Sequence, residues 1–170
     1  MKKFLTMAAL IVMAAMCLTS CGSDDDEPAQ TSTTATYKMT FSQDVIDNFD
    51  VILVYKGNNG QNIPVTVSGT EWTKSASCSK LPADFGVKYI FTLKEGVELV
   101  KDKYDLDVLF NIEINKGSTH FKQDIVVCKS VGTKKDKVLD QMNRLSGQSC
   151  GFTVGKDGSI LPNSYLKFDY

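Results

Sequence analysis

The feature that most constrains the fold of this chain is a long stretch in which apolar and other side chains alternate. Apolar residues occupy every second position of this stretch: Tyr104, Leu106, Val108, Phe110, Ile112 and Ile114. Because successive side chains of a β-strand point to opposite faces of its sheet, the stretch predicts a strand with one face in a core and the other in water. A turn at 115–118 then predicts a hairpin that pairs 104–115 with 119–129.

Further segments show strand patterns along the chain. They are the alternating segments 37–41, 63–67 and 85–93, the apolar run 51–55, and the aromatic segment 165–170, which predicts a last strand. An Asn-Gly turn at 57–60 predicts a hairpin of 50–56 with 62–68. Pro64 has no N–H to donate, which predicts that its strand lies at a sheet edge. The Ser- and Lys-containing segment 73–84 predicts a loop.

One segment changes from a period of two residues to the spacing of a helix. Val138, Met142 and Leu145, with Leu139 beside them, predict a short amphipathic helix within 134–146. Thr133 and Asp136 resemble a capping box at its start. Gly147 follows as a stop signal.

These elements together predict an all-β fold: antiparallel strands in a two-sheet sandwich, with one short helix. Turn signals recur along the chain, and strands do not alternate with helices in the βαβ manner. The size and the order of elements are similar to immunoglobulin-like domains of surface lipoproteins, without the Cys…Trp…Cys spacing of antibody domains. A closed β-barrel is the alternative. The domain is predicted to span 36–170.

The first twenty residues have the features of a secretory signal peptide. Lys2 and Lys3 form a positive start, and the apolar stretch 4–18 is too short for a permanent membrane span. The segment Leu18-Thr19-Ser20-Cys21 resembles the lipobox of bacterial lipoproteins. This resemblance implies cleavage of the signal peptide 1–20 and lipidation of Cys21, whose acyl chains, palmitate among them, anchor the protein to the outer membrane.

Residues 21–35 predict a flexible tether between the lipid and the domain. The acidic run 24–27 resembles the export signal that follows the lipidated cysteine in many Bacteroidetes surface lipoproteins. That resemblance implies display on the cell surface. The alternative is a solvated spacer on a protein that stays on the periplasmic face.

Composition and motifs argue against catalysis and against nucleic acid as a partner. The chain has 19 basic and 20 acidic side chains, with one arginine and no basic stripe. His120 lies beside a turn and has no nucleophile in the arrangement of a hydrolase. Asp105 and Asp107 share the polar face of a strand, where calcium binding or carboxylate catalysis are alternatives to simple solvation. We therefore predict no enzyme activity, no cofactor and no metal.

Three cysteines remain once the signal peptide has left and Cys21 is lipidated. They are Cys78, Cys128 and Cys150, so at most one disulfide can form. Cys128 with Cys150 is the candidate pair. Three free thiols, buried in the fold, are the favoured alternative.

The remaining candidates for a binding site are aromatic residues and loops. Trp72 breaks the alternation of its neighbours, which a bulge at Gly69 would explain, and Trp72 with Tyr55 predicts an aromatic platform for a sugar. A role of Trp72 in the core is the alternative. The turns 57–61 and 115–119 and the loop 73–84 are the predicted contact regions.

The sequence thus predicts a non-enzymatic lipoprotein of the cell envelope whose sandwich binds an external protein or glycan. The alternative is a structural or accessory subunit of an outer-membrane assembly. In that alternative the last strand, 165–170, pairs with the sheet edge of a neighbour.

Overall fold

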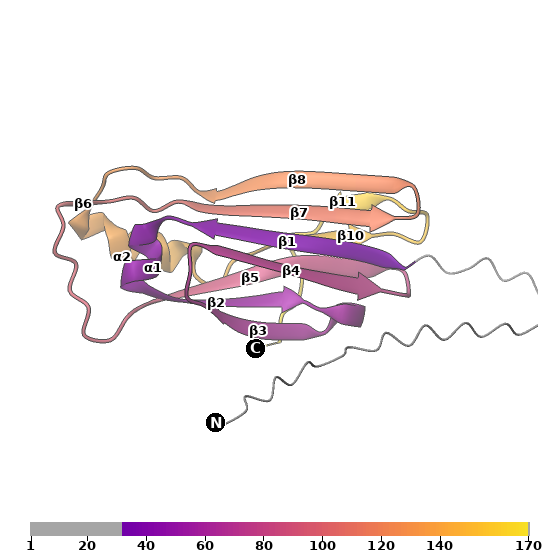
Figure 1. The fold of residues 1–170 in the computed structure, drawn as a ribbon, viewed down its shortest axis with the longest axis horizontal. Helices are drawn as coiled ribbons and strands as arrows, with labels where there is room; N and C mark the ends of the chain where they lie inside the picture. Colours follow the sequence, from indigo (N-terminus) through magenta and orange to yellow (C-terminus); the bar gives the residue numbers. More distant parts are fainter. Residues whose placement is uncertain (1–31, 170) are drawn as a thin grey trace, which may run out of the picture.

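The computed structural model describes residues 32–169, so the predicted signal peptide, the lipobox with Cys21 and the acidic run lie outside the described residues. The described chain is an antiparallel β-sandwich, as the sequence predicts, with two larger sheets facing each other across one core (Figure 1). We name the four-stranded sheet A and the five-stranded sheet B.

Sheet A has the strand order β4-β1-β7-β8. Its strands are β1 (Thr33–Phe41), β4 (Glu71–Cys78), β7 (Val108–Lys116) and β8 (Thr119–Cys128). Sheet B has the order β11-β10-β5-β2-β3. Its strands are β2 (Phe49–Lys56), β3 (Asn62–Val67), β5 (Ala83–Leu93), β10 (Ser149–Val154) and β11 (Ile160–Pro162). A separate two-stranded ladder joins β6 (Lys103–Tyr104) to β9 (Thr133–Lys134).

Both predicted hairpins are confirmed: β2 pairs with β3, and β7 pairs with β8. Pro64 lies exposed in β3 at the edge of sheet B, as predicted. The six apolar side chains from Tyr104 to Ile114 are all buried. The long predicted strand is nevertheless interrupted between β6 and β7, because the carboxylates of Asp105 and Asp107 accept hydrogen bonds from the N–H groups of Gly132 and Ser130.

The predicted loop at 73–84 is wrong, because its first part forms β4 and its end begins β5. Only Trp72 and Ala76 of β4 are buried, so the outward Thr, Lys and Ser residues hide the alternation. The chain passes from sheet B to sheet A between β3 and β4. The phase change at Trp72 therefore comes from a change of sheet and not from a bulge at Gly69.

The domain begins slightly earlier than predicted. β1 starts at Thr33, and both Thr33 and Ala35 are buried, so the last three residues of the predicted tether belong to sheet A.

The predicted last strand is also wrong for the residues described there, 165–169. Instead of extending a sheet, this segment crosses the outer face of sheet B. Leu166 is buried over Gly86 and Gly151, and the Lys56 ammonium donates to the carbonyl of Lys167.

The helices differ from the prediction in number. α2 (Lys135–Leu145) matches the predicted helix, with Val138 and Met142 in the core and Gly147 at positive φ after its end. The predicted capping box is absent, because Lys134 is the N-cap and Thr133 hydrogen-bonds to Ser130. A second helix, α1 (Gln43–Asn48), was not predicted, since its six residues are too few to show a helical period.

The two ends of the sandwich differ in content, and we name them by β1 (Figure 1). The tether end is where the described chain enters at Thr33; it holds the turn between β7 and β8 and the short helix η1 (Asn58–Gly60). The far end is where β1 finishes at Phe41; it holds α1, α2 and the segment 94–102. β1 has nine residues, so the ends lie about 30 Å apart at roughly 3.4 Å per residue.

Candidate functional site

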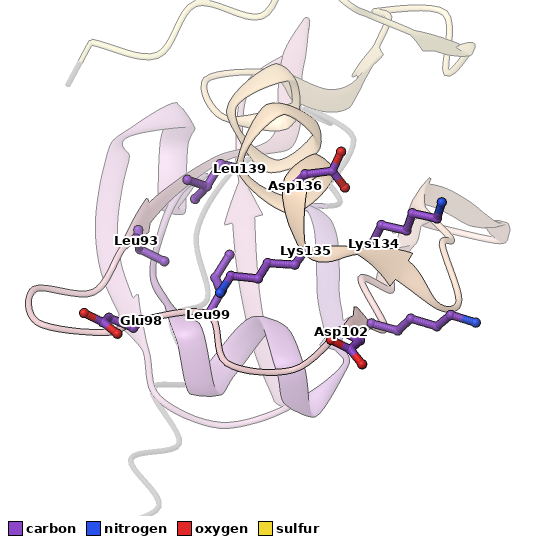
Figure 2. A pocket seen from close by; sticks show the side chains of 9 residues that line it. Leu93, Glu98, Leu99, Asp102, Lys134, Lys135, Asp136 and Leu139 are labelled. Carbon is purple, nitrogen blue, oxygen red and sulfur yellow. The ribbon is translucent and has the colours of Figure 1, made fainter.

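A cavity of about 750 Å³ opens at the far end of the sandwich (Figure 2). The segment 94–102 with its neighbours forms one wall, and the start of α2 forms the other. Its lining consists of Leu93, Glu98, Leu99, Asp102, Lys103, Lys134, Lys135, Asp136 and Leu139.

Backbone and side-chain hydrogen bonds hold the segment 94–102 in place. The backbone N–H of Lys94 donates to the carbonyl of Asn48 at 3.0 Å, and the Lys94 ammonium donates to the carbonyl of Ile46 at 2.7 Å. Leu99, in the middle of the segment, is only 7% exposed and belongs to the core. This wall of the cavity is therefore anchored to α1 and to the core.

An ion pair between Asp44 of α1 and Lys101 fixes the second half of this wall. The Asp44 carboxylate also accepts the backbone N–H of Asp105 at 2.8 Å. Burial alone would raise the pKa of Asp44, but the hydrogen bonds from Lys101 and Asp105 outweigh burial and lower this pKa below its usual value. Asp44 therefore ties α1 to two points of the far end.

The second wall is set by α2 and the ladder that precedes it. The backbone N–H of Lys135, in the first turn of α2, donates to the carbonyl of Asp102 at 3.2 Å and joins the two walls. Leu139 is 41% exposed and lines the cavity, while its neighbour Val138 is fully buried. α2 thus has a core-facing side and a second apolar position that faces the cavity.

The cavity combines an apolar surface with a charged rim. In Figure 2, Leu93, Leu99 and Leu139 lie together on one side, and Asp102, Lys134 and Asp136 lie on the other. Three lysines and three carboxylates line the cavity, so their charges balance. Such a surface suits an apolar anchor side chain flanked by charged groups of both signs.

The aromatic platform predicted at Trp72 and Tyr55 is not accessible as such. Trp72 is 8% exposed and lies within the core. Its ring is stacked on Tyr37 at a centroid distance of 6.5 Å and contacts Tyr55 edge-on at 5.3 Å. Because the rings cover one another, the indole has no free face on which a sugar can stack.

The other candidate residues do not converge on one site. His120 is exposed on β8, and Asp105 and Asp107 hold the backbone of 130–132. In the described residues no three His, Cys, Asp or Glu side chains gather in a way that would hold a metal ion. Cys78, Cys128 and Cys150 are free thiols, so the candidate disulfide is not formed; of the three, Cys128 is buried and the others are partly exposed.

The predicted contact loops lie at the opposite end from the cavity. The turns at 57–61 and 115–119, and the end of the segment 73–84, are at the tether end (Figure 1). The sequence does not predict the cavity, although it places Leu139 beside the core-facing positions of the predicted helix. A polar segment with isolated apolar residues, such as 94–102, gives no periodic signal.

Comparison with known proteins adds no relative: no family model, no curated protein and no solved structure matches this chain. Among the described residues, neither helix has the length and apolar character needed to cross a bilayer.

Proposed function

We propose that this protein is a non-enzymatic lipoprotein of the cell envelope, anchored through Cys21, that binds an external protein with the cavity at its far end. One observation carries the proposal. The cavity lies about 30 Å from Thr33, the point where the tether joins the sandwich, so an anchored membrane does not cover it. The signal peptide and the lipobox supply the anchor in this proposal.

The lining of the cavity favours a protein over a glycan as the partner. Its lining of described residues contains no aromatic ring, whereas sugar sites use exposed rings for stacking. Five of the seven exposed large apolar side chains of the described residues lie toward the far end: Val100, Leu109, Val126, Val131 and Leu139. Exposed apolar residues with charges around them are typical of protein-binding surfaces.

The alternative is an accessory subunit of an outer-membrane assembly. The same cavity then binds a neighbouring envelope protein. The side of the membrane on which the domain stands distinguishes the two roles.

Epitope insertion tests the surface location. A short epitope is placed in the exposed turn at Gly96, with a cytoplasmic and a periplasmic protein as controls for cell integrity. We expect antibody to stain intact cells, and Cys21→Ser to abolish both palmitate labelling and staining. Staining that appears only after the outer membrane is broken places the domain in the periplasm and favours the accessory role.

Photo-crosslinking tests the binding site. A photoreactive residue is introduced at Leu139, which lines the cavity, or at Asn143, which is exposed one turn further along α2 and does not line it. On intact cells bathed in their natural medium, we expect a discrete protein adduct from position 139 and none from position 143. Equal adducts at both positions, or none at either, would contradict the proposed site.

A further inference from the structure

The free edge of β8 is an exposed row of backbone hydrogen-bonding groups. β8 has ten residues and pairs with β7 on one side only. In an antiparallel strand, every second residue directs its N–H and C=O away from that neighbour. Among the described residues, no backbone group of 119–127 bonds to a main chain other than β7, and only the Gln123 amide reaches the carbonyl of Asp124.

The other three edges of sheets A and B each carry a feature that blocks pairing. On β4, the side-chain oxygen of Asn58 accepts the N–H of Ser77 at 2.9 Å. β3 contains Pro64, and β11 is only three residues long and ends in Pro162. Proteins protect sheet edges in these ways because an open edge pairs with another strand. β8 has ten residues and no proline; a register irregularity next to Val127 and the Gln123 amide on the carbonyl of Asp124 interrupt only part of its edge, which leaves the rest open for pairing.

We infer that β8 pairs with β8 of a second copy of this chain, antiparallel, around a two-fold axis at Gln123. This register places Lys122 directly opposite Asp124 of the second copy, and the symmetry makes this pair twice. An axis at Lys122 would set two ammonium groups against each other, and an axis at Asp124 would set two carboxylates against each other. Of these three registers, charge therefore favours the one centred on Gln123.

The apolar residues of β8 fit the same register. Phe121 faces the inside of the sandwich, where it contacts Phe152, and lies opposite Ile125 of the second copy. Ile125 lines a small cleft of about 180 Å³ together with Cys150, Phe152 and Pro162. Pairing thus brings Phe121 of one copy beside the open cleft of the other, where both half-buried side chains lose further contact with water.

This arrangement is compatible with two lipid anchors on one membrane. Antiparallel pairing puts the two Thr33 residues at opposite ends of the dimer. Residues 21–32 reach at most about 40 Å at roughly 3.4 Å per residue, which exceeds the length of the sandwich. Both chains reach the bilayer when their strands lie along its surface. The inference goes beyond the proposed binding function and does not depend on it.

Site-specific disulfide formation tests the pairing. Gln123→Cys lies opposite itself across the axis, where antiparallel Cα atoms are about 4.5–5.5 Å apart and a disulfide fits. Ser75→Cys, exposed on β4 at the other edge of sheet A, is the matched control, and the wild type controls for the three natural thiols. In membranes with the full chain, mild oxidation should give a dimer for Gln123→Cys alone. Equal dimer fractions for Gln123→Cys and Ser75→Cys would overturn the inference.

A charge exchange in the Gln123→Cys background makes the test specific for the register. Lys122→Asp and Asp124→Lys each place like charges opposite one another twice, and we expect each to lower the dimer fraction about tenfold. The double variant restores two opposite-charge pairs and should restore the dimer. It does not restore the ion pair of Lys122 with Glu113 within the chain, so recovery cannot come from monomer stability. A double variant as defective as the single ones would overturn the inference.

Discussion

The tether end and the far end of the sandwich are closed in different ways. At the tether end, short connections join neighbouring strands: two residues, Gly117 and Ser118, link β7 to β8. Asn58 covers the edge of β4 there. At the far end, the connections that lead from β5 to β7 and from β8 to β10 are long, and polar side chains such as Asp44 and Lys94 hold the first of them.

This difference indicates which end is built for stability and which for binding. Short turns continue the ladders and leave little space between the strands. The longer segments of the far end enclose a cavity and leave Val100, Val131 and Leu139 exposed. Binding residues commonly lie on loops that a rigid scaffold positions. We use the word body for sheets A and B with the core between them. We therefore expect substitutions in the body to change stability and substitutions at the far end to change binding.

The largest effect is expected from the aromatic cluster of the body. Trp72→Ala removes a buried indole that packs on Tyr37 and Tyr55, and should lower the free energy of unfolding by about 3–5 kcal/mol. Leu139→Ala, at the half-exposed cavity wall, should cost about 1 kcal/mol or less. Urea denaturation of both variants measures the two losses in the free energy of unfolding. Equal losses would break the distinction between body and far end.

Trp72→Phe sharpens the same test. The indole Nε1 is buried and has no hydrogen-bond partner among the described residues. Phe keeps an aromatic ring and removes this unpaired donor, so we expect a much smaller loss than for Ala.

The next effect concerns the C-terminal segment. Leu166→Ala removes the side chain that covers Gly86 and Gly151, and should cost about 2–3 kcal/mol. Val100→Ala is the far-end control, because Val100 is 81% exposed and should leave stability unchanged. A Leu166→Ala variant as stable as the wild type would show that the segment does not stabilise its own domain. That result would favour the alternative in which this segment pairs with the sheet edge of a neighbour.

A glycine pair gives a third, smaller contrast. A Cβ at Gly86 would lie 2.5 Å from the carbonyl oxygen of Cys150, so Gly86→Ala should cost about 1–3 kcal/mol. At Gly69, near the far end, a Cβ meets nothing closer than 4.0 Å and φ is not positive. Gly69→Ala should therefore be neutral or slightly stabilising. Thermal unfolding of the two variants compares them directly.

The sequence predicted the body of the molecule much better than the far end. Alternation identified β5, β7 and both hairpins, because each of these strands has one face in the core. It missed β4, whose outward Ser and Thr residues and inward Ala76 give a weak contrast. Trp72 is in the core because the chain changes from sheet B to sheet A before β4, and the residue type alone does not reveal this.

The candidate site was not predictable from local pattern. Leu99 and Leu139 are 40 residues apart, and the carbonyl of Asp102 joins the two cavity walls by accepting a hydrogen bond from the start of α2. Lys101 and Asp44 are likewise distant in sequence. Interactions of this kind depend on how the strands are ordered in the two sheets, which single-sequence periodicity does not determine.

The smallest expected effect compares two carboxylates in acid. Asp44 at the far end joins Lys101 and Asp105, whereas among the described residues Asp157 at the tether end bonds within its own turn, to the hydroxyl and N–H of Ser159. Burial alone would raise the pKa of Asp44, but the hydrogen bonds from Lys101 and Asp105 outweigh burial and lower this pKa. The bonds from Ser159 lower the pKa of Asp157.

Because both pKa values are lowered on folding, each carboxylate stabilises the fold above its ordinary pKa, near 3.8, and loses this contribution as the pH falls through the folded-state value. Asp44→Asn and Asp157→Asn should therefore lower stability at pH 7 and approach the wild type near pH 2. Asp44→Asn should have the larger effect, since it releases contacts between distant segments. Urea midpoints at both pH values test this ranking, and a larger effect of Asp157→Asn would mean that the long connections of the far end do not depend on their polar side chains.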